Sequence, residues 1–446
     1  MKELKFLKVL ILICIVLSII GGIIFSYQRL NLGKISLIDM LSNKQISFLK
    51  MIPEIAGFNG ERNYLLLFQN NLELRPSGGY LGNFGIIKVK NGNSISFEIH
   101  DTNIFDGFGK VITEAPKPIQ DYLGMDNWQM RDGNWSPDFK ISAKQVEYFY
   151  HLQGGHEDFD GIIAVNASVL PDLLELTGPI YLEEFNREFE SEDVLYQLEY
   201  EVEKAYVDRN IEEGERKKIF KALVKDVLEK AIQGSLSFKN EFKNLVLKEL
   251  DEKNVILFLD DANIQKTTSR FGWDGEVDQS YESDYLMIVE ANLGSKKSNF
   301  FVEREVEYSI NLNEEKPRVN LKIKYSHQNG KKDWFNDDYR FYLRVYTPLG
   351  SWLENTNGMT GQTEFTDDLN KTVFGSWIEV PAGQEKEIEL EYILPISVKQ
   401  AEYKILVQKQ SGIDSFPFRL IIEKDKKYTK EKNITRDWEG VISFEK

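Results

Sequence analysis

Tyr64-Leu65-Leu66-Leu67-Phe68 is the stretch of this sequence that decides the fold. Its residues are all apolar over the length of one strand, which is typical of a strand buried on both faces. Asn91-Gly92 follows between two shorter strand-like runs and is the strongest local signal for a hairpin. Asp160–Val165 is typical of another strand, and Ala167–Leu176 of a helix that Thr177-Gly178-Pro179 ends. This mixture predicts an α/β core domain over residues 51–294, with a mixed sheet and flanking helices.

The predicted secondary structure changes from mixed helices and strands to strands alone from Phe300 onward. Short strand-like runs recur at close spacing as far as Ile422, and no run with a helical period separates them. This spacing predicts an immunoglobulin-like β-sandwich domain over residues 295–423. The charged residues 424–446 are interpreted as a tail beyond the sandwich.

The N-terminus predicts a single membrane anchor. Residues 9–25 carry no charge, and as a helix they would cross about 26 Å at about 1.5 Å per residue. Lys2, Lys5 and Lys8 precede this run, which favours a cytoplasmic N-terminus. A cleaved signal peptide is the alternative, although no small-x-small cleavage site follows the apolar run. The predicted segments are a cytoplasmic N-terminus at 1–8, a transmembrane helix at 9–26 and a stalk at 27–50.

These segments predict a location. The chain would be a single-pass protein of the plasma membrane whose bulk is extracytoplasmic, and the lipid bilayer would be a partner. Composition excludes several classes. With 55 basic and 71 acidic residues, the 446-residue chain has a net charge of −16, which disfavours general nucleic-acid binding. A single cysteine excludes a disulfide framework, and the four histidines lack the spacing of a zinc protease.

Arg75, Gly78 and Gly79 form the first candidate binding site. They follow the buried strand, and α/β sheets place ligands at the carboxyl ends of their strands. A guanidinium fork suits phosphate or carboxylate, and glycines let backbone amides approach an anion. The alternative is a turn whose arginine pairs with Glu73 or another acid.

Asp101 and Asp138 are the candidate catalytic residues. Asp101 ends the second strand of the hairpin, where it could bind a divalent cation such as Mg²⁺ or act as a base. The alternative for Asp101 is an Asx turn that caps the following loop. Asp138 lies in a loop with three candidate ligand-binding residues, which could hold a hard cation or a sugar, with Trp135 as a stacking face. The alternative is a loop pinned by Asx turns with Trp135 in the core. The three candidates in this loop are Arg131, Asp132 and Asn134.

A basic cluster on a long predicted helix is the last candidate. Arg209 and Arg216, followed by Lys217 and Lys218, contrast with the acidic exterior and could face a pyrophosphate. The alternative is a solvated helix face on which nearby glutamates pair with these residues.

Several separate segments together resemble a bacterial envelope family catalogued as domain of unknown function 4012. The resemblance covers roughly residues 60–400, with the segments in the family's order, and implies a membrane-anchored exterior protein without a known reaction. The segments are Tyr64–Gly79, Asn134–Phe139, Asp160–Val165, Thr177–Pro179 and Gly272–Gly275.

The order of parts is also similar, more distantly, to the LytR-CpsA-Psr phosphotransferases, which move lipid-linked glycopolymers onto peptidoglycan. This resemblance implies that Arg75, Arg209 and Arg216 face a lipid pyrophosphate and that Asp101 holds Mg²⁺ or takes a proton. The family's arginine before the aspartate is His100 here, and its Arg-x-Asp-Thr segment is replaced by Gly78–Asn83. The fold could therefore carry over without the phosphotransfer.

We therefore expect a membrane-anchored envelope protein that binds a cell-envelope glycan or a polyprenyl-phosphate-linked ligand in its α/β domain, without turnover. The alternative is a phosphotransferase that moves a lipid-linked glycopolymer onto a cell-wall acceptor. A polyprenyl-linked glycan or peptidoglycan would be the partner in either case, and nucleic acid would not.

Overall fold

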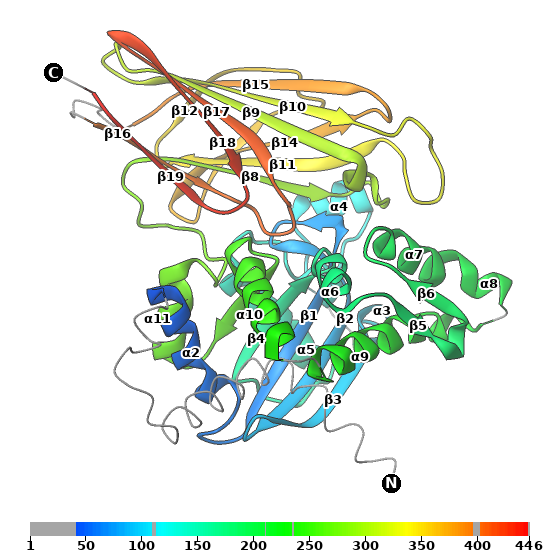
Figure 1. Ribbon diagram of the computed structural model, residues 1–446. Helices are drawn as coiled ribbons and strands as arrows, with labels where there is room; N and C mark the ends of the chain where they lie inside the picture. Colours follow the sequence, from blue (N-terminus) through cyan, green and yellow to red (C-terminus); the bar gives the residue numbers. More distant parts are fainter. Residues whose placement is uncertain (1–41, 109–112, 210, 234–235, 396–401, 445–446) are drawn as a thin grey trace, which may run out of the picture. The chain divides into compact units, whose positions relative to one another are not determined.

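The computed structural model describes residues 42–108, 113–209, 211–233, 236–395 and 402–444 (Figure 1). These residues form two compact units that interleave along the chain. Within the described ranges, unit 1 contains residues 42–69, 81–108 and 150–274, and unit 2 contains 70–80, 113–149 and 275–444. The sequence interpretation had divided the chain linearly at residues 294/295. The difference arises because the tip of the first hairpin and a loop-rich segment pack with the β-rich part of the chain.

The predicted cytoplasmic N-terminus, the transmembrane helix at 9–26 and most of the stalk lie outside the described residues. Among the residues that are described, no helix has the length and apolar character needed to cross a membrane. The last residues of the expected stalk belong to helix α2 (Asn43–Ile55), which Ser42 and Gln45 start with a capping box. Its residues Phe48, Met51 and Ile52 are buried in the core of unit 1, so this stretch is part of the fold.

Unit 1 is built on a five-stranded mixed sheet with the order β3-β2-β1-β4-β7. β1 and β4 are parallel, whereas β4 and β7 are antiparallel, and so are β2 and β3. Asn91 and Gly92, with φ of +50° and +73°, turn the chain between β2 and β3 as predicted. The strands are β1 (Arg62–Arg75), β2 (Gly78–Lys90), β3 (Asn93–Asp101), β4 (Gly161–Asn166) and β7 (Val255–Leu259).

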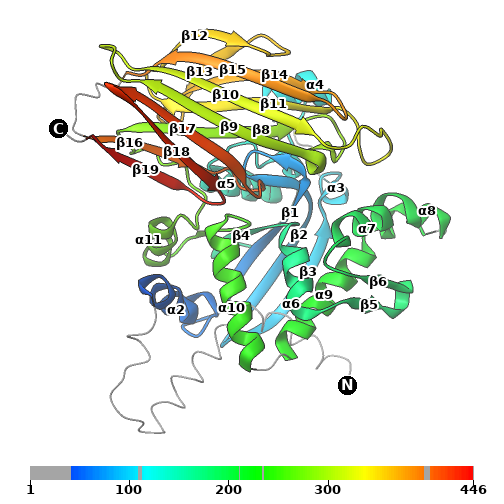
Figure 2. The same cartoon turned by 45° about the horizontal axis from the view of Figure 1, so that its top comes forward.

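Three helices lie over one face of this sheet (Figures 1 and 2). Phe242 and Leu250 from this layer share a core with Leu66, Ile163 and Leu257 of the sheet. The mixed α/β character predicted for this part of the chain is confirmed. The three helices are α6 (Val169–Thr177), α9 (Lys218–Gln233) and α10 (Leu236–Asp251), and α11 (Ala262–Phe271) also belongs to unit 1.

A smaller core in unit 1 lies between α6, α9 and a hairpin of short strands. Its buried members include Phe189, Val202 and Leu223. This core positions a π-helical turn that carries Glu201 and Glu203, two charged residues used below. The elements are β5 (Ile180–Leu182), η4 (Glu183–Phe185), β6 (Arg187–Phe189), α7 (Val194–Tyr200), the π-turn η5 (Glu201–Ala205), α8 (Tyr206–Asp208) and η6 (Glu213–Glu215).

Unit 2 contains two six-stranded sheets that share one apolar core. Strand β10 shows why: Val319, Leu321, Ile323 and Tyr325 are buried and alternate with polar residues. The β-rich region predicted after residue 294 is confirmed, and it begins earlier. The strands are β8 (Asp284–Asn292), β9 (Val302–Asn311), β10 (Arg318–His327), β11 (Tyr339–Pro348), β12 (Trp352–Asn357), β13 (Glu364–Asp368), β14 (Lys371–Val380), β15 (Glu385–Ile393), β16 (Glu402–Gln408), β17 (Phe416–Lys424), β18 (Lys426–Ile434) and β19 (Trp438–Ser443).

Residues interpreted as a charged tail form the last two strands of unit 2. β18 pairs with β17 over its whole length, and β19 pairs with β16. Each stands at the end of a sheet. Lysine-rich composition is typical of strands at the edge of a sheet, which accounts for the misleading charge. The helical elements of unit 2 are α4 (Lys117–Leu123), η3 (Met130–Asp132), α5 (Phe139–Leu152), whose residues from Tyr150 onward are assigned to unit 1, and η7 (Ser298–Phe301).

Candidate functional site

Arg75, the centre of the first candidate site, is buried in unit 2 with 2% of its side chain exposed. Its Nε donates to Asp132 Oδ1 at 3.0 Å, and its Nη2 donates to Glu73 Oε1 at 2.9 Å. Its Nη1 donates to the carbonyl oxygens of Asn292, at 2.6 Å, and Leu74, at 3.3 Å. Burial works against the charge, but Glu73 and Asp132 hold the pKa of Arg75 above its ordinary value. Every nitrogen of the guanidinium thus already has an acceptor within the protein.

Gly78 and Gly79 allow the close backbone packing of this turn. Gly78 has a φ of +142°, a conformation that favours glycine. A Cβ on Gly79 would lie 2.1 Å from the carbonyl carbon of Asn70 and 2.2 Å from the backbone nitrogen of Asn71. The Gly79 carbonyl also accepts a hydrogen bond from Nδ2 of the buried Asn134, at 2.8 Å. Packing therefore explains both glycines without an anion.

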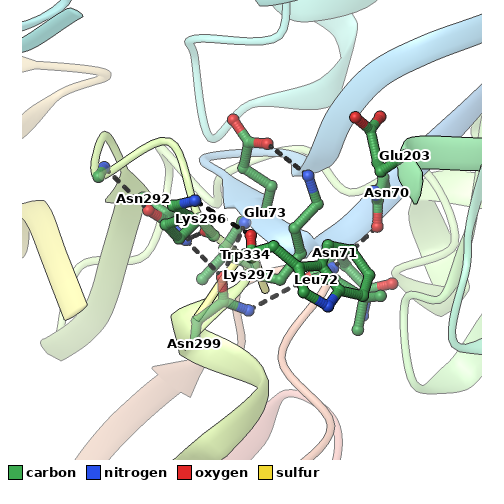
Figure 3. A network of polar contacts seen from close by, with 12 residues as sticks. Asn70, Asn71, Leu72, Glu73, Glu203, Asn292, Lys296, Lys297, Asn299 and Trp334 are labelled. Carbon is green, nitrogen blue, oxygen red and sulfur yellow. Dashed lines mark hydrogen bonds and ion pairs between the residues drawn. The ribbon is translucent and has the colours of Figure 1, made fainter. Parts of the chain in front are cut away.

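An amide network fixes residues 70–75 within unit 2 (Figure 3). Nδ2 of Asn299 donates to the carbonyl of Asn71 at 2.9 Å. Oδ1 of Asn299 accepts from the backbone nitrogen of Leu74, at 3.2 Å, and from Nδ2 of Asn292, at 2.8 Å. This turn is therefore held by Asn299 of η7, which Asn292 of β8 in turn binds.

Asp138 and Arg131, in the third candidate loop, also bind protein groups. Asp138 is buried, and its Oδ2 accepts from the backbone nitrogen of Val277 at 3.0 Å. Its Oδ1 accepts from the backbone nitrogen of Ile141 at 3.3 Å, in the first turn of α5. Arg131 donates to the side-chain oxygen of Gln129. The carboxylate expected to be catalytic thus joins two backbone segments.

Trp135, the expected stacking face, is covered by a cation. The guanidinium of Arg344 lies 4.8 Å from the centre of its ring and donates to its carbonyl oxygen at 2.8 Å. The alternative of a paired arginine describes Arg75. The alternative for the loop holds in part, because Asp138 pins the loop but Trp135 is half-buried and not in the core.

Asp101 ends β3 in unit 1, where a buried lysine binds it. Its Oδ2 lies 3.0 Å from Nζ of Lys217, and its Oδ1 accepts from the backbone nitrogen of Asn103 at 2.9 Å. This second bond caps the short helix α3 (Thr102–Phe105), as the Asx alternative predicted. Nζ of Lys217 also donates to the carbonyl of Gly82 at 2.7 Å. Asp101 is therefore the partner of a cation.

Lys217 is nine-tenths buried, with 9% of its side chain exposed. Burial lowers its pKa, and the attraction of Asp101 opposes this effect without cancelling it. Lys217 immediately precedes α9, whose N-terminus supplies backbone N–H groups without intrahelical partners and the positive end of the helix dipole. Arg216 stands beside it and pairs with Glu203 at 2.9 Å. Three consecutive basic residues thus lie at the start of α9, and each is paired with a carboxylate.

Arg209 belongs to a neighbouring ion cluster in unit 1. Oε2 of Glu201, a residue with 2% of its side chain exposed, lies 2.7 Å from Nη1 of Arg209. Arg209 Nη2 donates to Oε1 of the same carboxylate at 3.0 Å, and Arg187 Nε lies 3.2 Å from it. Glu201 and Glu203 both lie on the π-helical turn, a geometry that is frequent at functional sites. The structure therefore pairs both predicted arginines with acids of this turn.

Two exposed apolar side chains follow Asp101. Ile104 is 45% exposed and Phe108 is 72% exposed. Asp101 pairs with Lys217 at the start of α9, and Ile104 and Phe108 follow Asp101 closely along the chain. We call Asp101, Ile104, Phe108, Arg216 and Lys217 the α9 cluster.

Mg²⁺ was expected at Asp101, and the residues around it do not fit a resident ion. Both carboxylate oxygens are engaged, one of them by Lys217. Over the described ranges, no three His, Cys, Asp or Glu side chains are arranged to hold a metal. A metal would need to displace the ammonium of Lys217.

Glu201 is absent from the candidates that the sequence suggests, and Lys217 is included there only as one member of the basic cluster. Lys217 stood among four basic residues with nothing to distinguish it. The available signal was its position directly before the apolar positions Ile219, Leu223 and Val227, which are buried in the structure. A lysine directly before the apolar face of a core-packed helix is expected to be buried together with the start of that helix.

Taken together, the units define a chain with a mixed α/β unit, a cationic cluster at a helix N-terminus and a β-rich unit. Residues 59–202 match the family described as "Protein of unknown function (DUF4012)". The first family resemblance drawn from the sequence is thereby confirmed. The resemblance to the LytR-CpsA-Psr phosphotransferases stays a prediction.

No curated protein matches the chain. Among solved structures, protein gbs0355 from Streptococcus agalactiae is 12% identical, with a TM-score of 0.31, over 50% of this chain and 76% of that one. The transcriptional regulator yvhJ from Bacillus subtilis is 12% identical, with a TM-score of 0.23, over 48% and 97%. Protein lpg2210 from Legionella pneumophila is 9% identical, with a TM-score of 0.21, and this chain, over 31% of its length, covers 54% of that one. At these TM-scores the similarities carry no argument about function.

Proposed function

We propose that unit 1 binds a phosphate-bearing ligand of the cell envelope, such as a polyprenyl-phosphate-linked glycan, at the α9 cluster and without chemical turnover. The chain would be held at the plasma membrane by the segment at 9–26, and its β-rich unit would be an immunoglobulin-like sandwich. The observation that supports the proposal most is Lys217. Its ammonium is nine-tenths buried at a helix N-terminus, beside Arg216 and paired with the carboxylate of Asp101.

The physical reason is an uncompensated cost. Burial disfavours the charged form of Lys217 more than Asp101 favours it. A phosphate would bring further negative charge to the same ammonium and to the N–H groups at the start of α9. A lipid-linked ligand would also cover Ile104 and Phe108, which are exposed without it.

Binding is favoured over transfer because of Asp101. A general base must be able to accept a proton from the acceptor hydroxyl. Here the carboxylate forms an ion pair with Lys217 at 3.0 Å and caps α3. The carboxylate therefore competes with an anionic ligand for the ammonium.

Titration of the full chain in detergent with farnesyl pyrophosphate tests the proposal by thermal shift. Ligand at about 100 Kd should add about 2.7 kcal/mol to the stability of the protein. Lys217→Gln should abolish the shift, whereas Asp101→Asn should tighten binding because the competing carboxylate is removed. Lys218→Gln is the matched control, since Lys218 is 59% exposed and pairs with Glu215 on the surface.

Three results would contradict the proposal. If neither inorganic pyrophosphate nor farnesyl pyrophosphate shifts the melting temperature of the wild type, unit 1 has no such anion site. An equal loss in the Lys218→Gln control would point to general charge. Release of phosphate in the presence of a glycan acceptor, lost in Asp101→Asn while binding persists, would establish the phosphotransferase instead.

A further inference from the structure

Strand β18 and the residue pair before it form a basic strip on an acidic protein. Residues 424–432 contain five lysines against Asp425 and Glu431, a net charge of +3 in a chain whose net charge is −16. β18 is the end strand of its sheet, and most of its side chains are exposed. Edge lysines discourage pairing with another strand, which is the ordinary reason for such a composition. The positions of the lysine ammonium groups point to a second role.

Three of the five lysines of this strip, Lys424, Lys426 and Lys430, lie over aromatic rings. Lys430 Nζ is 5.2 Å from the ring centre of Trp438, a residue of β19, the end strand of the other sheet. The rings themselves are half-buried, and Tyr428 and Phe444 meet edge to face at 5.2 Å. The other two lysine–ring distances are 5.2 Å for Lys426 over Tyr428 and 4.1 Å for Lys424 over Phe444.

Trp438 lies flat because of the glycine two residues after it. A Cβ on Gly440 would meet the indole of Trp438 at 2.5 Å and 3.0 Å, so the ring lies against the backbone of β19. On its other side the indole packs on Phe418 at 5.9 Å. β18 and β19 run side by side at one edge of unit 2 (Figures 1 and 2). The strip therefore combines packed aromatic rings with flexible lysine side chains that lie over them.

We propose that this strip binds an anionic glycan, a sugar chain that carries phosphate or carboxylate groups. A pyranose ring presents an apolar face of C–H groups to an aromatic ring, and the lysines now over the rings would swing onto the anionic groups. The flexible lysine side chains allow that exchange, since an ammonium over a ring is worth only about 0.5–1 kcal/mol at an exposed site. This proposal concerns unit 2 and does not depend on the α9 cluster.

A glycan is favoured over a membrane surface by the rings. Aromatic residues that anchor a protein to a membrane reach out into the interface. Here Tyr428, Trp438 and Phe444 are half-buried, and Tyr428 and Phe444 are in contact, so the rings lie along the surface where a chain of sugar rings can stack on them. The alternation of cation and ring also fits a polymer that alternates anionic groups and sugar rings.

Binding of the full chain to polygalacturonate, a carboxylate-bearing sugar chain, tests the proposal. Quenching of tryptophan fluorescence and salt dependence are the readouts. Dextran is the uncharged sugar, polyphosphate is the anion without sugar, and vesicles of phosphatidylglycerol are the membrane. We expect polygalacturonate to bind with an affinity that falls with salt, and to bind more tightly than each of the other three.

Two variants test the lysines and the aromatic rings separately. Lys426→Gln with Lys430→Gln should weaken binding about tenfold or more, while Trp438→Phe should weaken polygalacturonate binding but leave any polyphosphate binding unchanged. Lys331→Gln, at a lysine that is 78% exposed elsewhere in unit 2, should change nothing. Equal binding of polyphosphate, unaffected by Trp438→Phe, would reduce the strip to a nonspecific charge. Binding of vesicles in preference to polygalacturonate would overturn the proposal in favour of a membrane surface.

Discussion

Replacement of Arg75 by methionine decides whether this residue serves the fold or a ligand. Methionine keeps most of the volume, so the main effect is electrostatic. The change leaves the carboxylate of Asp132, which is 2% exposed, without its guanidinium at 3.0 Å. Loss of one partner of a buried ion pair costs about 3–5 kcal/mol. Glu73 suffers less, because Lys297 also lies 3.7 Å from it.

Urea unfolding of the full chain at pH 7, followed by tryptophan fluorescence, measures this cost. With a slope of about 3 kcal/mol per molar urea, the transition midpoint should fall by about 1 M or more. Lys117→Met is the matched control, because Lys117 pairs with Asp121 at 2.6 Å but is 73% exposed, and such pairs are worth about 0–1 kcal/mol. Arg75→Met with Asp132→Asn should recover part of the loss, since the second change removes the unpaired charge.

A midpoint within the error of the control would refute this reasoning. So would an unchanged midpoint combined with complete loss of farnesyl pyrophosphate binding, because that pair of results would restore Arg75 as a ligand fork. A binding titration beside the urea series therefore distinguishes the two roles.

Three other changes test the packing and the buried charges. Burial raises the pKa of Glu249 from 4.5 to about 8, so the folded protein keeps a proton that the unfolded chain releases. The stability of the fold should therefore fall as the pH rises from about 4.5 to about 8. Urea midpoints at pH 6 and 8.5 should differ less in Glu249→Gln than in the wild type. Gly79→Ala should prevent folding or cost several kcal/mol, judged by circular dichroism, whereas Gly214→Ala, with nothing within 4 Å, should not. Glu290→Gln should lower stability by about 3–5 kcal/mol, because Arg304, at 2.6 Å, loses its charge partner in the core; a loss below about 1 kcal/mol in thermal unfolding would contradict this.

Local patterns predicted the parts of this fold that local forces determine. The run Tyr64–Phe68 lies in the parallel strand β1, and the turn at Asn91 and Gly92 is a hairpin. The helix predicted to stop at Gly178 ends at Thr177, with Gly178 at its C-cap. In each case the signal lies within a few residues of the structure that it specifies.

The candidate site could not be predicted in the same way, because its contacts are distant in sequence. Arg75 binds Asp132, 57 residues away, and the carbonyl of Asn292, 217 residues away. Lys217 binds Asp101, 116 positions earlier. Sequence reasoning identified unusual charged residues, but it could not show which of them neutralise each other.

The lysine-rich end of the chain misled for a different reason. Only Tyr428 and Ile434 mark the inward face of β18, and the remaining side chains are polar because the strand forms an edge. A pattern that depends on two residues in nine is easily taken for a tail.

The interleaving of the two units has a consequence for synthesis on the ribosome. The first segment of unit 2, residues 70–80, leaves the exit tunnel long before its partners at Asn292, Asn299 and Gly412, and before β19 completes the second sheet. At about 5–20 residues per second, the segment waits roughly 20 to 75 s for the end of the chain. During that time Leu72 and Leu74, buried in the finished protein, have no core to enter. The same interleaving means that residues 59–202, the part that matches the family, contain pieces of both units, and a fragment cut to those bounds would lack the partners on which its own hairpin tip depends.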